Sequence, residues 1–178
     1  ALQAGYQAIG IDHFALPDDS LATAARTGSL HRNFQGFTDD RAKTLIGLGA
    51  SSISQFPGLI VQNEKHVGAW RMRAGNGRLA GVRGVVRSAA DRMRGLVIER
   101  LLCDGAVDLA EIAALHDRPL SEFDESVATL ADLAARGLVT IDGARIAITQ
   151  DGRPYARLVA NAFDAHRKPA PGTASRAV

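Results

Sequence analysis

The sequence is short of cysteine, of long apolar runs and of net charge, and each shortage excludes a class of protein. Cys103 is the only cysteine among 178 residues, so a disulfide framework is excluded and a reducing, cytoplasmic location is expected. No apolar run approaches the roughly 18 residues that a membrane-spanning helix needs. No secretion signal is visible at the start of the chain. The formal net charge of +2 by itself implies no polyanionic partner.

Apolar residues are abundant, which indicates a folded protein with a packed core. They make up 46% of the sequence, and this length suffices for one medium domain or two small ones. Turn and helix signals divide the chain into four parts. We predict an α/β segment over residues 1–63, a connecting helix and linker over 64–84, a mostly helical domain over 85–167 and a loose tail over 168–178.

Residues 1–63 combine strand and helix signals. Tyr6–Phe14 is a mostly apolar run of strand length, suited to a buried strand. Helix-starting residues and a terminal glycine bracket Leu21–Arg26, which predicts a helix. Leu45–Ser54 and Leu59–Val61 are predicted as further strands, the first with two glycines where another backbone or a ligand can approach. These strands cannot close a barrel, so we interpret them as the last pieces of a larger sheet.

The rest of the chain shows helices, a hairpin and a last helix. Capping residues mark the helix starts, and Asp142-Gly143 is a strong two-residue hairpin signal. The predicted elements are a connecting helix over Glu64–Ala74 capped by Asn63, helices beginning at Ser88, Asp108, Pro119 and Thr149, and strands over Leu138–Ile141 and Arg145–Ile148. This order describes a winged-helix-like domain.

A winged helix by itself suggests DNA binding, but the charges argue against it. Residues 85–168 contain 11 Lys and Arg and 13 Asp and Glu. The third helix, which would enter the DNA groove, carries four acidic residues, and such residues repel phosphate. They are Glu122, Asp124, Glu125 and Asp132. We therefore predict no nucleic-acid partner, with a nucleic-acid-binding domain and a purely structural scaffold as the alternative hypotheses.

Three short blocks near the start of the chain indicate a binding site. They are Gly5–Phe14, Leu30–Gly36 and Gly47–Ser54. Each is too polar or too rich in glycine to be only a core strand. Apolar walls with a few hydrogen-bonding groups are typical of a pocket, here one for a large, flat, anionic ligand.

Taken together, the blocks resemble the oxygen-independent coproporphyrinogen III oxidases (coproporphyrinogen dehydrogenases), a radical S-adenosylmethionine family of haem biosynthesis. The resemblance runs from Gly5 to about Asp164, and Leu30-His31-Arg32-Asn33-Phe34-Gln35-Gly36 is its most specific part. It implies a C-terminal part only, in which the end of a partial TIM-like barrel precedes the winged-helix-like domain. The implied reaction converts two propionates of coproporphyrinogen III to vinyl groups by oxidative decarboxylation, which gives protoporphyrinogen IX.

The resemblance also implies cofactors. They are S-adenosylmethionine and a four-iron four-sulfur cluster, which family members bind through the three thiolates of a C-x-x-x-C-x-x-C loop. Cys103 is a single thiol on a predicted helix, and such clusters need several thiolates. We therefore expect the cluster ligands in an N-terminal catalytic region that precedes this chain. The chain alone is expected to be inactive, its partners to be that region and coproporphyrinogen III, and the enzyme to be a monomer.

Five residues form the candidate site. By resemblance, Phe34 and Gln35 lie at the active site beside substrate and cofactor, and Ile53, in a Ser-x-Ile-Ser phrase, contacts S-adenosylmethionine. His31 and Arg32 are candidates for binding substrate propionates, because imidazolium and guanidinium groups pair with carboxylates. Each candidate also has a plainer interpretation. Phe34 and Gln35 can form a turn with Phe34 anchored in the core, and Ile53 can pack in the core. Arg32 can be an ordinary surface residue, and His31 can be bonded to the backbone.

No metal site is predicted among the histidines. A zinc site needs three or four converging ligands, whereas His66, His116 and His166 lie on separate predicted helices. Asp12-His13 is better explained as an Asp–His hydrogen bond at a strand end. The family pattern is broken at Phe37-Thr38-Asp39, where Tyr-Thr-Thr is usual. This change removes a phenol and adds a charge near the expected pocket.

Overall fold

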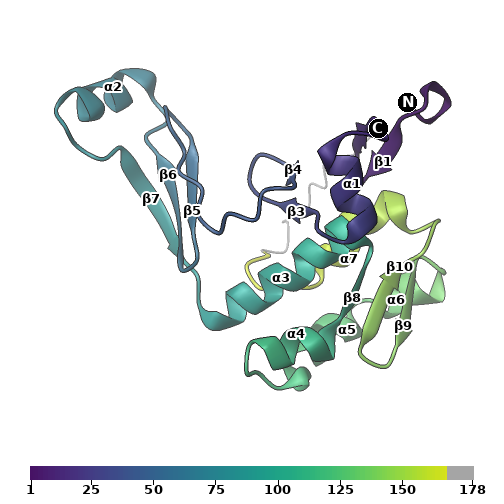
Figure 1. Ribbon diagram of the computed structural model, residues 1–178. Helices are drawn as coiled ribbons and strands as arrows, with labels where there is room; N and C mark the ends of the chain where they lie inside the picture. Colours follow the sequence, from purple (N-terminus) through teal and green to yellow (C-terminus); the bar gives the residue numbers. More distant parts are fainter. Residues whose placement is uncertain (168–178) are drawn as a thin grey trace.

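The computed structural model describes residues 1–167, with helix α3 (Ala89–Asp104) at its centre. Figure 1 shows the C-terminal elements on one side of α3, two short hairpins and a helix on the other, and an arm (residues 53–86) that projects from its N-terminal end. No helix among the described residues is long and apolar enough to cross a membrane. The predicted tail over 168–178 lies outside the described residues. Helices and sheets are thus mixed along the chain, and the strand pairs of the described residues are antiparallel.

The C-terminal half contains one antiparallel sheet and several short helices. The sheet has the order β8-β10-β9, in which β9 (Val139–Asp142) and β10 (Arg145–Ile148) form the predicted hairpin. Arg145 pairs with Asp142, so Gly143 and Ala144 make the turn. The other elements are β8 (Ala106–Asp108), α4 (Leu109–Leu115), η2 (Leu120–Phe123), α5 (Asp124–Ala128), α6 (Ala131–Ala135), η3 (Arg153–Tyr155) and α7 (Ala156–Asn161).

Side-chain caps fix several helix starts as predicted. Ser88 and Asp91 form a capping box at the start of α3, and Asp108 accepts two backbone N–H groups at the start of α4. Thr149 accepts a backbone N–H as well, but the chain first makes a 3-10 turn there and the α-helix begins only at Ala156. The third predicted helix is divided into η2, α5 and α6.

The two larger apolar cores share α3. The larger core joins α3 to the C-terminal elements and includes Phe123 and Phe163, whose rings meet edge to face with centroids 6.0 Å apart. The smaller core packs the first hairpin and the first helix against α3 and includes Ile9, Leu30 and Cys103. Because α3 contributes to both cores, it fixes the N-terminal segment relative to the C-terminal domain.

The prediction of one strand over Tyr6–Phe14 is wrong, because this segment is a hairpin. β1 (Gln7–Ile9) pairs antiparallel with β2 (His13–Ala15). Gly10 lies between them with φ of 57°, a left-handed conformation that glycine adopts at little cost and that reverses the chain. The apolar run therefore does not cross a sheet as one buried strand.

A helix and a second hairpin follow. α1 (Ser20–Thr27) begins after the Asp19 cap and confirms the predicted helix. A short 3-10 turn, η1 (Leu2–Ala4), lies at the N-terminus, before the first hairpin. β3 (His31–Arg32) and β4 (Phe37–Thr38) then pair antiparallel. Neither strand was predicted, because two residues are too few for an apolar alternation.

The arm is a three-stranded antiparallel sheet with one helix. β5 (Ile53–Phe56), β6 (Leu59–Asn63) and β7 (Gly81–Val86) follow one another in the sheet, and α2 (Val67–Gly75) connects β6 to β7. The prediction of a strand over Leu45–Ser54 is wrong for most of that range. Only its first residue makes an isolated bridge, and the chain turns at residues 49–51 before β5 begins.

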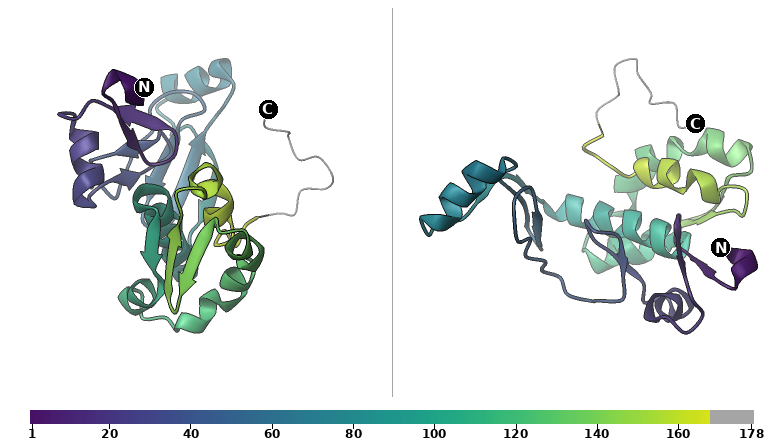
Figure 2. Two further views of the ribbon diagram at one scale, coloured as in Figure 1. Left: turned by 90° about the vertical axis from the view of Figure 1, so that its right-hand side faces the viewer. Right: turned by 90° about the horizontal axis from the view of Figure 1, so that it is seen from above.

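The connecting segment also differs from its prediction. The helix begins after a His66 cap, three residues later than expected, and no residue of α2 is buried. β7 lies across the predicted boundary between residues 84 and 85, and all of its residues are exposed. The right-hand view in Figure 2 shows the arm extending away from the rest of the molecule.

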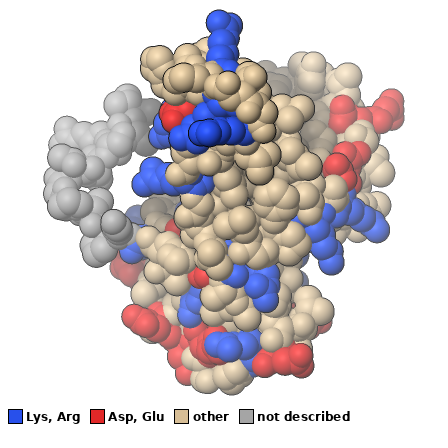
Figure 3. All heavy atoms as spheres, turned by 90° about the vertical axis from the view of Figure 1, so that its left-hand side faces the viewer, with Lys and Arg blue, Asp and Glu red and all other residues tan. Residues whose placement is uncertain are grey.

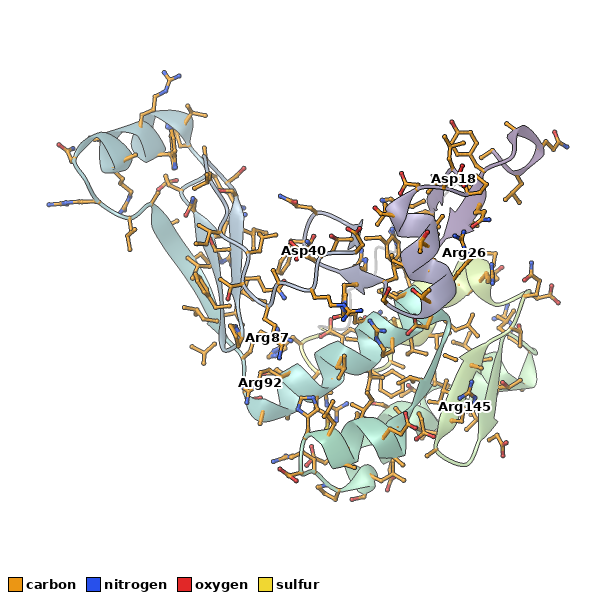
Figure 4. The ribbon with its side chains drawn as sticks, viewed as in Figure 1. Asp18, Arg26, Asp40, Arg87, Arg92 and Arg145 are labelled. Atoms are coloured by element: carbon orange, nitrogen blue, oxygen red, sulfur yellow. The ribbon has the colours of Figure 1, made fainter. Side chains whose placement is uncertain are left out.

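Two arginines mark the junction of the arm with α3 (Figure 4). Arg92 donates from Nη1 to the carbonyl oxygen of Arg87 at 3.1 Å, and the Arg87 N–H donates to the carbonyl oxygen of Gly58 at 2.9 Å. A Cβ atom at Gly95 would lie 2.5 Å from Arg87 Nη2. The Arg87 side chain therefore lies against bare backbone on α3 and links the helix to the arm.

Candidate active site

Phe34 and Gln35 lie at the tip of the β3–β4 hairpin. The Asn33 side chain closes this turn, since its Oδ1 accepts the N–H of Gln35 at 2.8 Å and that of Gly36 at 3.3 Å. The Asn33 N–H donates to the carbonyl oxygen of Gly36 at 3.0 Å. Phe34 is 51% exposed, so its interpretation as a core anchor is wrong, and Gln35 is exposed as well. A closed backbone thus presents an aromatic face and a donor–acceptor amide outward.

Phe37 joins this hairpin to the first one. The His13 ring meets it edge-on with centroids 5.1 Å apart, and Arg32 Cζ lies 5.8 Å from its ring centroid. A Cβ atom at Gly10 would lie 2.1 Å from Phe37 Cζ, so only glycine leaves room for the ring there. Arg32 itself is exposed, which leaves it on the surface beside the turn.

His31 is directed toward α3. Its Nδ1 lies 2.8 Å from Glu99 Oε1, so the partner of this nitrogen is a carboxylate rather than the backbone. Arg100 lies 3.0 Å from the same Glu99 oxygen and also donates from Nη2 to the carbonyl oxygen of Leu30 at 2.8 Å. Its Nη1 pairs with Asp104 at 2.9 Å. Burial raises the pKa of the Asp104 carboxyl, and Arg100 partly offsets that rise.

The Asp–His hydrogen bond expected in the first hairpin is present. His13 Nδ1 lies 2.8 Å from Asp12 Oδ1, and Arg157 Nη2 lies 2.7 Å from Asp12 Oδ2. The His13 bond is the main cause that lowers the pKa of the Asp12 carboxyl, and burial opposes it. About half or more of each of the three side chains is exposed. This network therefore ties the hairpin to α7 at the surface.

Ile53 lies apart from the turn, at the start of β5 in the arm. It pairs with Gln62, and its side chain is half-buried. A Cβ atom at Gly47 would lie 2.6 Å from the Ile53 carbonyl oxygen, which confirms the predicted close approach of another backbone. Asn63 donates from Nδ2 to the carbonyl oxygens of Gly47 at 3.2 Å and Gly49 at 3.0 Å. Its predicted role as a helix cap is therefore wrong, and it shapes the loop before Ile53 instead.

Cys103 is unsuited to bind a metal cluster. It is 9% exposed, and burial raises the pKa of its thiol to about 12, whereas metal ligands are thiolates. Within residues 1–167, no group of three or more His, Cys, Asp or Glu is arranged to hold a metal ion. The residues of this chain therefore do not fit a four-iron four-sulfur cluster.

A cavity of about 500 Å³ lies between the first hairpin, α1 and the C-terminal end of α3. Its walls include Arg26, Asp104 and Arg153. None of the five predicted site residues lines it. The candidate site of this chain is therefore the open β3–β4 turn and its surroundings.

Charges are distributed unevenly over the surface. Figure 3 faces the arm: Lys and Arg predominate at the top of the view, and both signs are mixed at the bottom. In the segment predicted as the acidic third helix, Glu122 pairs with Arg118 and Asp132 pairs with Arg136. Glu125 is exposed on the same segment. The prediction that this domain does not bind nucleic acid rests on these acidic side chains.

The chain is similar to known proteins over nearly its whole length. Residues 88–155 match the HemN C-terminal domain. The chain is 44% identical to the oxygen-independent coproporphyrinogen III oxidase of Bradyrhizobium diazoefficiens over 99% of its length, and 45% identical to that of Paracoccus denitrificans over 94%. It spans only 39% and 37% of the lengths of these two relatives.

A solved structure has the same fold. It is the coproporphyrinogen III oxidase (HemN) from Escherichia coli, described as a radical SAM enzyme. The TM-score is 0.87 and the identity 38%, over 93% of this chain and 38% of that one. The described fold therefore matches one part of that longer structure.

Proposed function

The chain corresponds to the C-terminal part of the oxygen-independent coproporphyrinogen III oxidases, and we propose that it completes the active site of such an enzyme. The observation that carries the proposal is the 44% identity to a coproporphyrinogen III oxidase over 99% of the chain. The proposed reaction is the oxidative decarboxylation of two propionates of coproporphyrinogen III to vinyl groups. The proposed enzyme is a cytoplasmic monomer that produces protoporphyrinogen IX for haem biosynthesis.

The cofactors belong mainly to the preceding region in this proposal. When bound with a four-iron four-sulfur cluster, S-adenosylmethionine would supply a radical able to remove a hydrogen atom from the propionate side chain. The single buried thiol of Cys103 does not fit that cluster, so its ligands are assigned to the region before this chain. What this chain adds is positioning of the reactants and exclusion of water.

The β3–β4 turn is the proposed contact with substrate and cofactor. The exposed Phe34 ring supports a flat pyrrole, and the Gln35 amide offers both a donor and an acceptor from a turn that Asn33 holds closed. Arg32 is exposed beside the turn and is the proposed partner of a substrate propionate. Ile53 is proposed to contact S-adenosylmethionine from the arm.

The two halves of the chain have different proposed roles. Residues 1–63 are proposed to be the last pieces of a partial barrel, residues 64–84 its connection, and residues 85–167 a winged-helix-like domain. The arm sheet exposes Val82, Val85 and Val86, and these apolar side chains are proposed to pack on the preceding region. The C-terminal domain then closes over the catalytic barrel. The proposal is tested by anaerobic turnover of coproporphyrinogen III by the complete enzyme.

The chain alone is expected to take up no cluster. Several thiolates are needed, and Cys103 is one buried thiol. The measurement is anaerobic reconstitution with iron and sulfide, followed by iron analysis and visible absorption, beside the complete enzyme as the positive control. Stoichiometric cluster binding by the monomeric chain would contradict the assignment of the ligands to the preceding region.

A further inference from the structure

We propose that Glu99 and Arg100 of α3 are positioning residues for the Phe34–Gln35 turn. The inference rests on the function proposed for that turn and assigns a role to the first helix of the C-terminal domain. These two residues act through His31 and Leu30 and not by touching the reactants.

Two neighbouring residues of the chain are held by two neighbouring residues of α3. The His31 ring is bound by Glu99 at 2.8 Å, and the Leu30 carbonyl oxygen is bound by Arg100 at 2.8 Å. Leu30 is fully buried in the smaller core. Two adjacent bonds of this kind fix both the position and the direction in which the chain enters β3. The turn follows directly, with Asn33 as its first residue.

The Glu99 carboxylate is the centre of this anchor. One of its oxygens contacts both His31 and Arg100, and the Glu99 side chain is only 25% exposed. Arg100 is 18% exposed and distributes its two Nη groups among Glu99, Asp104 and the Leu30 carbonyl. Charge-assisted hydrogen bonds that are shielded from water hold a geometry more firmly than surface pairs. The anchor therefore restrains the hairpin more than an exposed ion pair would.

α3 is itself held in place. Met93, Val97 and Leu101 recur every fourth residue and are fully buried in the larger core. Glu99 and Arg100 lie between Val97 and Leu101 in the sequence, outside this buried stripe, and are partly exposed. The helix thus packs on the C-terminal domain with one face and binds the hairpin with another, so the C-terminal domain sets the position of the turn.

The role differs from that of a substrate ligand. Glu99 contacts Nδ1 of His31 at 2.8 Å, so the loss of Glu99 acts on the turn through His31. A positioning role predicts that removal of the Glu99 carboxylate loosens the turn and misaligns the reactants, while the fold stays intact. Misaligned reactants lower the product formed for each S-adenosylmethionine cleaved.

The experiment compares Glu99→Ala and Glu99→Gln with the unchanged complete enzyme. Glu125→Ala is the matched control, because Glu125 is exposed and makes no ion pair within the described residues. Three quantities are measured: amide hydrogen exchange of residues 33–38, protoporphyrinogen IX formed per S-adenosylmethionine cleaved, and the melting temperature.

Glu99→Ala is expected to exchange amides of residues 33–38 about tenfold faster, because the hairpin opens locally more often. Its product per S-adenosylmethionine cleaved is expected to fall about fivefold or more, since the reactants are no longer aligned. Glu99→Gln keeps an acceptor oxygen but loses the negative charge that faces Arg100 and His31, so both quantities are expected to change in the same direction as in Glu99→Ala and by a smaller factor. Glu125→Ala is expected to change neither, and all melting temperatures are expected to agree within about 2 °C.

Unchanged exchange in Glu99→Ala overturns the proposal. It is also overturned if activity falls only in proportion to the unfolded fraction, because Glu99 is then a structural residue. An unchanged enzyme that forms no product contradicts the proposed function instead. The exchange measurement still decides the anchor in that case.

Discussion

Gln35→Ala in the complete enzyme is expected to slow protoporphyrinogen IX formation roughly ten- to hundredfold, as a lost hydrogen bond of ~1–3 kcal/mol requires. The Gln35 side chain is exposed at the tip of the turn. Its backbone N–H, which Asn33 binds at 2.8 Å, is kept by alanine. The turn therefore persists while the amide is lost. Initial rates and thermal denaturation are measured on the same preparation.

Gln150→Ala is the matched control for this variant. Gln150 is exposed in the turn after β10, away from the β3–β4 hairpin, and its replacement is expected to leave the rate within about twofold. If Gln35→Ala is as active as the unchanged enzyme, or melts early and loses activity only with the folded fraction, the turn is structural and the site assignment fails.

Phe163→Ala is expected to cost about 3–5 kcal/mol of unfolding free energy. Phe163 is fully buried and meets Phe123 edge to face with centroids 6.0 Å apart. Its removal leaves a cavity in the larger core and loses the aromatic contact. Since about 1 kcal/mol corresponds to ~2–4 °C for a chain of this length, the melting temperature is expected to fall by roughly 10 °C. Chemical denaturation of the chain measures the unfolding free energy, and thermal denaturation measures the melting temperature.

Leu158→Ala provides the comparison, because Leu158 lies on α7, five residues before Phe163. Leu158 is 51% exposed, and its truncation is expected to change the unfolding free energy by about 0.5 kcal/mol or less. Equal destabilisation by the two variants would mean that Phe163 is not part of the core that joins α7 to α3.

Elements with local signals were predictable from the sequence. The capping box at Ser88, the cap at Asp108 and the end of α1 at Gly28 depend on neighbouring residues only. The β9–β10 hairpin likewise follows from Asp142-Gly143 between two short apolar runs. Each of these features carries its cause within a few residues, so spacing and residue type suffice.

Short or exposed strands were not predictable in the same way. The run Tyr6–Phe14 has the composition of one buried strand, and only the left-handed backbone at Gly10 divides it into two. β7 is exposed along its whole length and shows no apolar alternation, so its position depends on pairing with β6. In both cases tertiary pairing decides the structure where the local pattern is ambiguous.

The residues of the candidate site could be predicted from a sequence motif, but their contacts in space could not. The family resemblance singles out Phe34 and Gln35, and the structure exposes both on one turn. The partner of His31 is Glu99, 68 residues further along the chain, and no local spacing links them. Ile53 lies in a different sheet from the turn. Long-range contacts therefore supply the part of the site that the sequence leaves open.

The most direct test of the proposed function is anaerobic turnover by the purified complete enzyme with its cluster loaded. Coproporphyrinogen III, S-adenosylmethionine and a reductant are supplied, and the tetrapyrroles are separated and quantified over time. The proposal predicts that protoporphyrinogen IX accumulates only when S-adenosylmethionine is present, and that this chain alone forms none. A loaded enzyme that cleaves S-adenosylmethionine but leaves coproporphyrinogen III unchanged would contradict it.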